Sequence, residues 1–124
     1  MTRTVLTIED QADIRRLIRM TLEFKGFRVL EAANGPDGLQ LARSQQPDLI
    51  LLDVMMPGMD GLTVSQTLAD DAALQRTPVI MLSALGTADA VQAGLQTGAR
   101  AYLVKPFSPW ELVALVDKLT ATTA

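Results

Sequence analysis

Three acids, one hydroxyl and one amine stand at or just after the ends of short apolar runs in this sequence. They are Glu9, Asp10, Asp53, Ser83 and Lys105. Carboxylates crowded together are unfavourable unless cations neutralise them. Mg²⁺ prefers oxygen ligands, whereas zinc normally recruits the nitrogen or sulfur of His and Cys, and the chain contains neither residue. These residue types therefore favour a magnesium site, provided that the runs are strands of one sheet.

Phosphoryl transfer is the chemistry that this set of groups suits. The reaction needs an acceptor oxygen and positive charge around the equatorial phosphoryl oxygens, which Mg²⁺ and Lys105 could supply, while Ser83 adds a hydrogen-bond donor. Because histidine is absent, a carboxylate must be the acceptor and the chain cannot be a phosphohistidine donor. Taken singly, Asp53 could cap a turn, Asp10 could be a helix N-cap and Lys105 could be a surface lysine. Because all of these residues stand at strand ends, a shared role in phosphoryl transfer is favoured over these separate structural roles.

The apolar runs themselves predict a parallel sheet. Five of them alternate with longer helical stretches, a pattern typical of βαβ units. The predicted strands span 4–8, 27–32, 49–53, 79–83 and 101–104. The last three are continuously apolar, so we expect them to be covered on both faces and to be central. Right-handed crossovers give a doubly wound α/β fold whose site lies at the carboxyl ends of the strands.

Helix signals fill the gaps between the strands. Apolar residues recur at helical spacing in residues 14–22 and 112–119. Gly26 stands where a helix-terminating glycine belongs, and Asn34-Gly35-Pro36 is typical of a helix start. A helix over about 87–97 has the weakest pattern.

Length and composition limit the class of protein. The 124 residues fit one compact domain covering 1–124, and no apolar run is long enough to span a membrane. Without cysteine or a signal-peptide pattern, we expect a cytoplasmic protein with no membrane association. The net charge of −3 and the lack of a basic face disfavour direct binding to nucleic acid.

Four segments resemble the receiver domains of two-component response regulators, and the resemblance covers essentially the whole chain. They are VLTIED from Val5, DLILLDVMMPGMDG from Asp48, PVIMLSALG from Pro78 and AYLVKPF from Ala101. The resemblance implies a flavodoxin-like (βα)5 fold with strand order 2-1-3-4-5. It also implies a signalling switch rather than a turnover enzyme, phosphorylated by a histidine kinase or a histidine phosphotransfer protein.

Specific roles follow from the resemblance. It implies that Asp53 accepts the phosphoryl group and that Mg²⁺ is bound by Asp10, Asp53 and the backbone carbonyl of Met55, with Glu9 assisting through water. Lys105 would pair with the phosphate, and the peptide before Pro106 would be cis. Ser83 and Tyr102 would form a switch pair that alters a partner-binding surface made by the fourth helix, fifth strand and fifth helix.

Departures from the family pattern refine these expectations. Arg100 and Ala101 replace an acidic pair common in receivers attached to winged-helix domains, which makes that symmetric dimer doubtful and a monomer expected. Met55 and Leu85 flank the path of attacking water and are apolar, so we predict slow autodephosphorylation. The chain is either a stand-alone receiver or a part of a longer regulator. The rival functions are a phosphatase or phosphotransferase with an aspartyl nucleophile, or a flavin domain on the same architecture.

Overall fold

The strands of the sheet are all parallel and lie in the order β2-β1-β3-β4-β5. The computed structural model describes residues 2–56 and 58–121. Its strands are β1 (Thr4–Ile8), β2 (Arg28–Ala32), β3 (Leu49–Asp53), β4 (Val79–Ser83) and β5 (Ala101–Val104). Continuous apolar runs form β3 and β4, because burial on both faces suits unbroken Ile, Leu and Val, whereas β2 includes Arg28 and Glu31. The predicted fold class and strand order are confirmed.

Five helices connect and follow the strands: α1 (Ala12–Phe24), α2 (Gly35–Gln45), α3 (Gly61–Asp70), α4 (Ala88–Gln96) and α5 (Pro109–Thr120). Local sequence signals mark their ends. Asn34 caps α2 by accepting a hydrogen bond from the Asp37 backbone N–H. Ser108 and Glu111 form a reciprocal capping box at the start of α5. Gly26 follows α1 with a φ of 92°, as its predicted role requires.

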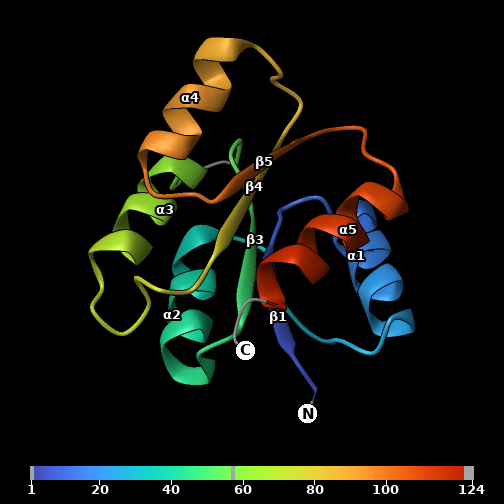
Figure 1. Cartoon of the computed structure of the whole chain (residues 1–124). Helices are drawn as coiled ribbons and strands as arrows, with labels where there is room; N and C mark the ends of the chain where they lie inside the picture. The colour runs from blue at the N-terminus through green and yellow to red at the C-terminus, as the bar shows by residue number, and fades with distance from the viewer. Residues whose placement is uncertain (1, 57, 122–124) are drawn as a thin grey trace.

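The helices form two layers around the sheet (Figure 1). Helices α1 and α5 cover one face, where Ile18, Leu22 and Val116 pack against Val5 and Leu51. Helices α2, α3 and α4 lie on the other side, over a second core that includes Leu6, Ile50 and Met81. Burial on both faces leaves the sheet edges and loops for function, so the strand ends are the place to look for a site.

Strand β5 departs from one expectation. Its apolar run predicted a central strand, but β5 pairs only with β4 and forms an edge of the sheet. The reason is that a continuous apolar run indicates that helices cover both faces of a strand. It does not indicate that the strand has a hydrogen-bonded neighbour along both of its edges. Leu103 belongs to the core under α5, and Tyr102 packs against the core on the opposite face. Val104 is 40% exposed, as an edge position allows.

None of the helices in the described residues combines the length and the apolar character needed to cross a bilayer. The described part of the chain therefore shows no membrane-spanning helix.

Candidate functional site

Acidic residues from two neighbouring strand ends meet at the carboxyl edge of the sheet. Glu9 and Asp10 follow β1, and Asp53 ends β3, which pairs with β1. Each of the three acids has a carboxylate oxygen within 4.8 Å of one from each of the others. Glu9 is fully buried and Asp53 is 3% exposed, so neither is a solvated strand end. The structure thus brings together the carboxylates that the sequence predicted.

Lys105 forms ion pairs with two carboxylates of this cluster. Its Nζ lies 2.7 Å from Glu9 Oε1 and 3.5 Å from Asp53 Oδ1. The Lys105 side chain is 13% exposed and therefore is not an ordinary surface lysine. The following peptide, Lys105–Pro106, is cis, as predicted. Three carboxylates against one ammonium leave an excess of negative charge in a mostly buried place.

Asp10 adds to this excess of negative charge with a carboxylate oxygen that has no hydrogen-bond partner. Helix α1 takes Gln11 as its N-cap residue, so Asp10 is not the N-cap of this helix. Its Oδ1 atom is buried and has no hydrogen-bond partner. Burying a carboxylate oxygen without a partner is costly, and a cation bound beside it would remove that cost. The donor set is all oxygen, which fits Mg²⁺ and does not fit a soft metal.

The electrostatics of the cluster appear most clearly at Glu9. Burial raises the pKa of its carboxyl from the ordinary 4.5 to about 7, and the neighbouring Asp53 adds to the rise. Lys105 acts in the opposite direction but does not outweigh burial. Without a metal ion, the cluster therefore holds a proton at Glu9 at pH values where an exposed glutamate has lost it.

This shift predicts a pH-dependent stability of the metal-free protein. Between pH 4.5 and about 7 the folded state keeps a proton that the unfolded chain has released. The contribution of Glu9 to the unfolding free energy is therefore greatest below pH 4.5, and it is lost as the pH rises from 4.5 through about 7. Compared with Glu9→Gln, which stays neutral, the wild type should lose on the order of 3 kcal/mol of unfolding free energy over that interval. Urea denaturation in EDTA at a series of pH values measures this, and parallel profiles for the two proteins would contradict it.

Ser83 and Tyr102 are joined through the loop that follows β4. Ser83 is buried, and its Oγ accepts a hydrogen bond of 3.0 Å from the Leu85 backbone N–H. The Tyr102 hydroxyl donates to the Leu85 backbone carbonyl at 2.9 Å. Ser83 and Tyr102 therefore both bind the backbone of Leu85, Ser83 at its N–H and Tyr102 at its carbonyl. A Cβ added at Gly94 of α4 would lie 3.0 Å from the Tyr102 ring, so the ring is in close contact with α4.

Three contributions to the site were not predicted from the sequence, because each of them involves a main-chain atom. Besides the two atoms of Leu85, Arg15 donates from its guanidinium to the Glu9 backbone carbonyl at 2.8 Å. Gly61 begins α3 directly against the backbone of Asp53, where an added Cβ would lie 2.4 Å from the Asp53 carbonyl oxygen. The only signal in the sequence is that Gly61 follows Asp60, which caps α3. That signal does not reveal the contact with Asp53.

Met55 is 58% exposed two residues after Asp53, and its backbone N–H donates to Asp53 Oδ1 at 3.1 Å.

Residues 5–117 match the family described as the response regulator receiver domain. The chain belongs to this family. Receiver domains bind Mg²⁺ at an acidic pocket, and in this chain Glu9, Asp10 and Asp53 form an acidic cluster.

Named relatives agree with the family assignment. The receiver domain is 43% identical over 121 residues to the phosphate regulon transcriptional regulatory protein PhoB of Pseudomonas aeruginosa, covering 98% of this chain and 53% of PhoB. It is 41% identical to the transcriptional regulatory protein SrrA of Staphylococcus aureus, covering 99% of this chain and 50% of SrrA. The chain therefore spans about half the length of these curated relatives.

Solved structures show the same fold. A putative response regulator from Chloroflexus aurantiacus superposes with a TM-score of 0.93 at 34% identity, with 98% of this chain and 99% of that chain covered. The chemotaxis response regulator CheY4 of Vibrio cholerae gives a TM-score of 0.91 at 31% identity, with 96% and 99% covered. The receiver fold is thus shared over nearly the full length of each.

Proposed function

We propose that this receiver domain takes a phosphoryl group from a phosphohistidine donor onto Asp53, with Mg²⁺ bound, and that the modification alters the surface formed by α4, β5 and α5. The observation that carries the proposal is the buried carboxylate cluster of Glu9, Asp10 and Asp53 with Lys105 in contact with two of its members. Receiver domains of response regulators interact with histidine kinases, and a kinase or a histidine phosphotransfer protein is the proposed donor.

Asp10, Asp53 and the backbone carbonyl of Met55 would hold the Mg²⁺ ion, and Glu9 would assist through water. The partnerless Oδ1 of Asp10 supports this assignment. Bound Mg²⁺ supplies positive charge to the phosphoryl oxygens and offsets the repulsion among the acids. The proton at Glu9 would then be lost at neutral pH, since a divalent cation favours the charged carboxylate.

Asp53 attacks the phosphorus of the donor. The new P–O bond forms to a carboxylate oxygen of Asp53 while the P–N bond to the donor imidazole breaks, and the imidazole takes up a proton. The Met55 N–H fixes the carboxylate through Oδ1, at 3.1 Å. Lys105, already 3.5 Å from the same oxygen, pairs with the arriving phosphoryl group. These contacts orient the acceptor before the donor arrives.

The switch works through Leu85. A phosphoryl group on Asp53 attracts the Ser83 hydroxyl, which at present accepts from the Leu85 N–H. Movement of that loop disturbs the bond between the Leu85 carbonyl and the Tyr102 hydroxyl, so Tyr102 can rotate inward beside α4. Leu95 of α4 and Val104 of β5 are 41% and 40% exposed, and they would form part of the surface offered to a downstream protein.

The domain is proposed to act as a switch without turnover of an external substrate. The position two residues after Asp53, where an aspartyl phosphatase would need a second acid or base, is occupied by Met55. Met55 and Leu85 are 58% and 46% exposed near the site and cannot orient attacking water through their side chains. Slow autodephosphorylation therefore stays a prediction, as does the cytoplasmic location.

The test is phosphotransfer from a panel of phosphorylated histidine kinases in the presence of Mg²⁺. Borohydride reduction, which converts an aspartyl phosphate to homoserine, followed by mass spectrometry locates the modified residue. We expect label on Asp53 alone and loss of labelling in EDTA. Label on any other residue would overturn the site assignment.

Asp10→Ala separates the magnesium role from phosphorylation in general. This variant should lose Mg²⁺ uptake in calorimetry at neutral pH and should be phosphorylated poorly. Asp89→Asn, an exposed acid in the first turn of α4, is the matched control and should bind Mg²⁺ like the wild type. If Asp10→Ala is phosphorylated normally and the wild type takes up no Mg²⁺, the proposed function is wrong.

A further inference from the structure

A network of ion pairs joins α1 to β2 beside the carboxylate cluster. Arg15 Nε lies 3.3 Å from Glu31 Oε1, and Arg19 Nη1 lies 2.7 Å from Glu31 Oε2. Arg19 also pairs with Glu23 of the same helix, at 3.2 Å. None of the steps proposed for phosphoryl transfer uses these four side chains.

Arg15 differs from Arg19 because it also reaches the main chain of the site. Its Nη1 donates to the Glu9 backbone carbonyl at 2.8 Å, whereas both acceptors of Arg19 are carboxylates. A guanidinium group is planar and holds its donors in a fixed fork, so the pairing of Nε with Glu31 constrains where Nη1 lies. The side chains of Arg15 and Glu31 are only 21% and 26% exposed, so solvent screens this pair in part. Glu31 therefore directs Arg15 toward Glu9.

The backbone of Glu9 is held on both sides of its Cα. Its N–H donates to the Ala32 carbonyl of β2 at 3.0 Å, and its carbonyl accepts from Arg15. That carbonyl belongs to the planar peptide that leads into Asp10, so its direction sets where the Asp10 side chain begins. Asp10 Oδ1 has no hydrogen-bond partner of its own. The position of this oxygen therefore depends on the main chain that carries it.

The start of α1 lacks a restraint that the other helices have. Its N-cap residue, Gln11, makes no capping hydrogen bond with its side chain. The remaining four helices of residues 2–56 and 58–121 each begin with such a bond, made by Asn34, Asp60, Thr87 and Ser108. The short loop from Glu9 to Gln11 is therefore without the usual local anchor. Arg15, one turn into α1, anchors this loop through the Glu9 carbonyl instead.

We infer that Arg15, oriented by Glu31, is a positioning residue for Mg²⁺: it fixes the peptide between Glu9 and Asp10 so that the Asp10 carboxylate is placed to bind the ion. This inference rests on the proposed function, because it takes Asp10 as a ligand of Mg²⁺. It extends the site to Glu31 of β2, which is outside the carboxylate cluster. Partners that orient metal ligands without touching the metal typically contribute about 10-fold to 100-fold to metal affinity.

Arg15→Met separates positioning from charge. Methionine keeps an unbranched side chain but donates no hydrogen bond and carries no charge. Removal of a positive charge beside a cation site would by itself tighten Mg²⁺ binding. Loss of positioning should instead weaken it, by about 10-fold, as measured by isothermal titration calorimetry at neutral pH. A variant that binds Mg²⁺ as tightly as the wild type, or more tightly, overturns the inference.

Arg19→Met is the matched control. Arg19 pairs with Glu31 as Arg15 does, but the guanidinium hydrogen bonds that the structure describes for it go only to carboxylates. This variant should bind Mg²⁺ like the wild type. A loss of affinity as large as that of Arg15→Met would show that the contact with Glu9 is not what matters, and the inference would be wrong.

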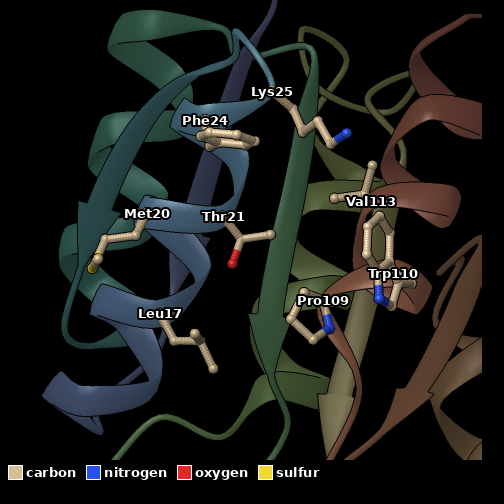
Figure 2. Close-up of a pocket in the computed structure, with 8 residues that line it drawn as sticks. All are labelled: Leu17, Met20, Thr21, Phe24, Lys25, Pro109, Trp110 and Val113. Atoms are coloured by element: carbon tan, nitrogen blue, oxygen red, sulfur yellow. The ribbon is translucent and has the colours of Figure 1, made fainter.

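Neither substitution alters the side of α1 that faces α5. Leu17, Thr21 and Phe24 of α1 line an apolar groove together with residues of α5, as Figure 2 shows. At 3.6 residues per turn, positions 15 and 19 lie on another side of the helix, where they pair with β2. Both variants should therefore keep the wild-type circular dichroism.

Glu31→Gln tests whether Glu31 acts through Arg15. It should weaken Mg²⁺ binding several-fold, because Arg15 loses the partner that directs it toward Glu9. Combined with Arg15→Met, it should add little, since the two residues act on the site through the same contact. Independent losses in the double variant would overturn the role assigned to Glu31.

Amide hydrogen exchange in EDTA gives a readout that needs no metal. The Glu9 N–H donates to Ala32, and the Gln11 N–H donates to Glu9 Oε2 at 3.3 Å. Both amides should exchange faster in Arg15→Met than in the wild type or in Arg19→Met, because the loop opens more often. Unchanged exchange overturns the inference. A wild type that takes up no Mg²⁺ overturns the proposed function itself, whereas equal Mg²⁺ affinity with and without Arg15 overturns only the positioning role.

Discussion

Asp53→Asn is expected to reduce phosphorylation to background and, at the same time, to make the metal-free protein more stable. The loss follows because the amide cannot form the acyl phosphate. The gain follows because Asp53 is nearly buried among two other carboxylates, whose charge the contact with Lys105 offsets only in part. Removing one like charge from such a cluster should raise the unfolding free energy by about 1 to 2 kcal/mol at pH 8. Kinase assays and urea denaturation in EDTA measure the two effects.

The same variant should also change the titration of Glu9. Asp53 contributes to the raised pKa of Glu9, so its replacement should bring that pKa back toward 4.5 and flatten the dependence of stability on pH. Asp70→Asn is the matched control, since Asp70 is an exposed acid at the end of α3 whose side chain only accepts a bond from Gln66. It should change stability by less than about 0.5 kcal/mol. An Asp53→Asn protein less stable than the Asp70→Asn protein at pH 8 would show that repulsion does not dominate the site.

The acidic cluster could be predicted from the sequence because one rule places it. When alternating strands and helices build a parallel sheet, the residues after each strand gather at one edge. Glu9, Asp10 and Asp53 needed no further information to be brought together, and Lys105 followed from the end of the last strand. The apolar runs located four of the five strands to the residue and β2 to within one.

The edge position of β5 was implied by the resemblance and not by its apolar run, and the main-chain contacts were not predicted at all. Hydrophobicity reports whether helices cover the two faces of a strand, and β5 is covered on both although it pairs on one side only. Leu85 contributes its N–H and its carbonyl, which every residue except proline possesses, so its type carries no signal. Side-chain chemistry is visible in a sequence, whereas backbone geometry becomes visible only in the fold.

Gly61→Ala should be among the most damaging single substitutions in the chain. A Cβ at this position would lie 2.4 Å from the Asp53 carbonyl oxygen and 2.5 Å from the Val54 Cα. Both are backbone atoms, so no side chain can move aside to make room. The start of α3 would have to separate from the end of β3, breaking the bond of 2.9 Å between the Gly61 N–H and the Val54 carbonyl. We expect a loss of about 3 kcal/mol or more in unfolding free energy, measured by urea denaturation.

Gly86→Ala provides the comparison that separates steric contact from the loss of any glycine. Gly86 lies in the exposed loop between β4 and α4 at the same edge of the sheet, and a Cβ there would meet only the Val104 side chain, at 3.3 Å or more. It should be tolerated, and equal stability of the two alanine variants would contradict the proposed contact. Since α3 packs against the backbone of Asp53 itself, Gly61→Ala should also slow phosphorylation in molecules that remain folded. The carboxylate of Asp53, the proposed acceptor, is then positioned by the close contact of α3 with its backbone as well as by Met55 and Lys105 at its Oδ1 atom.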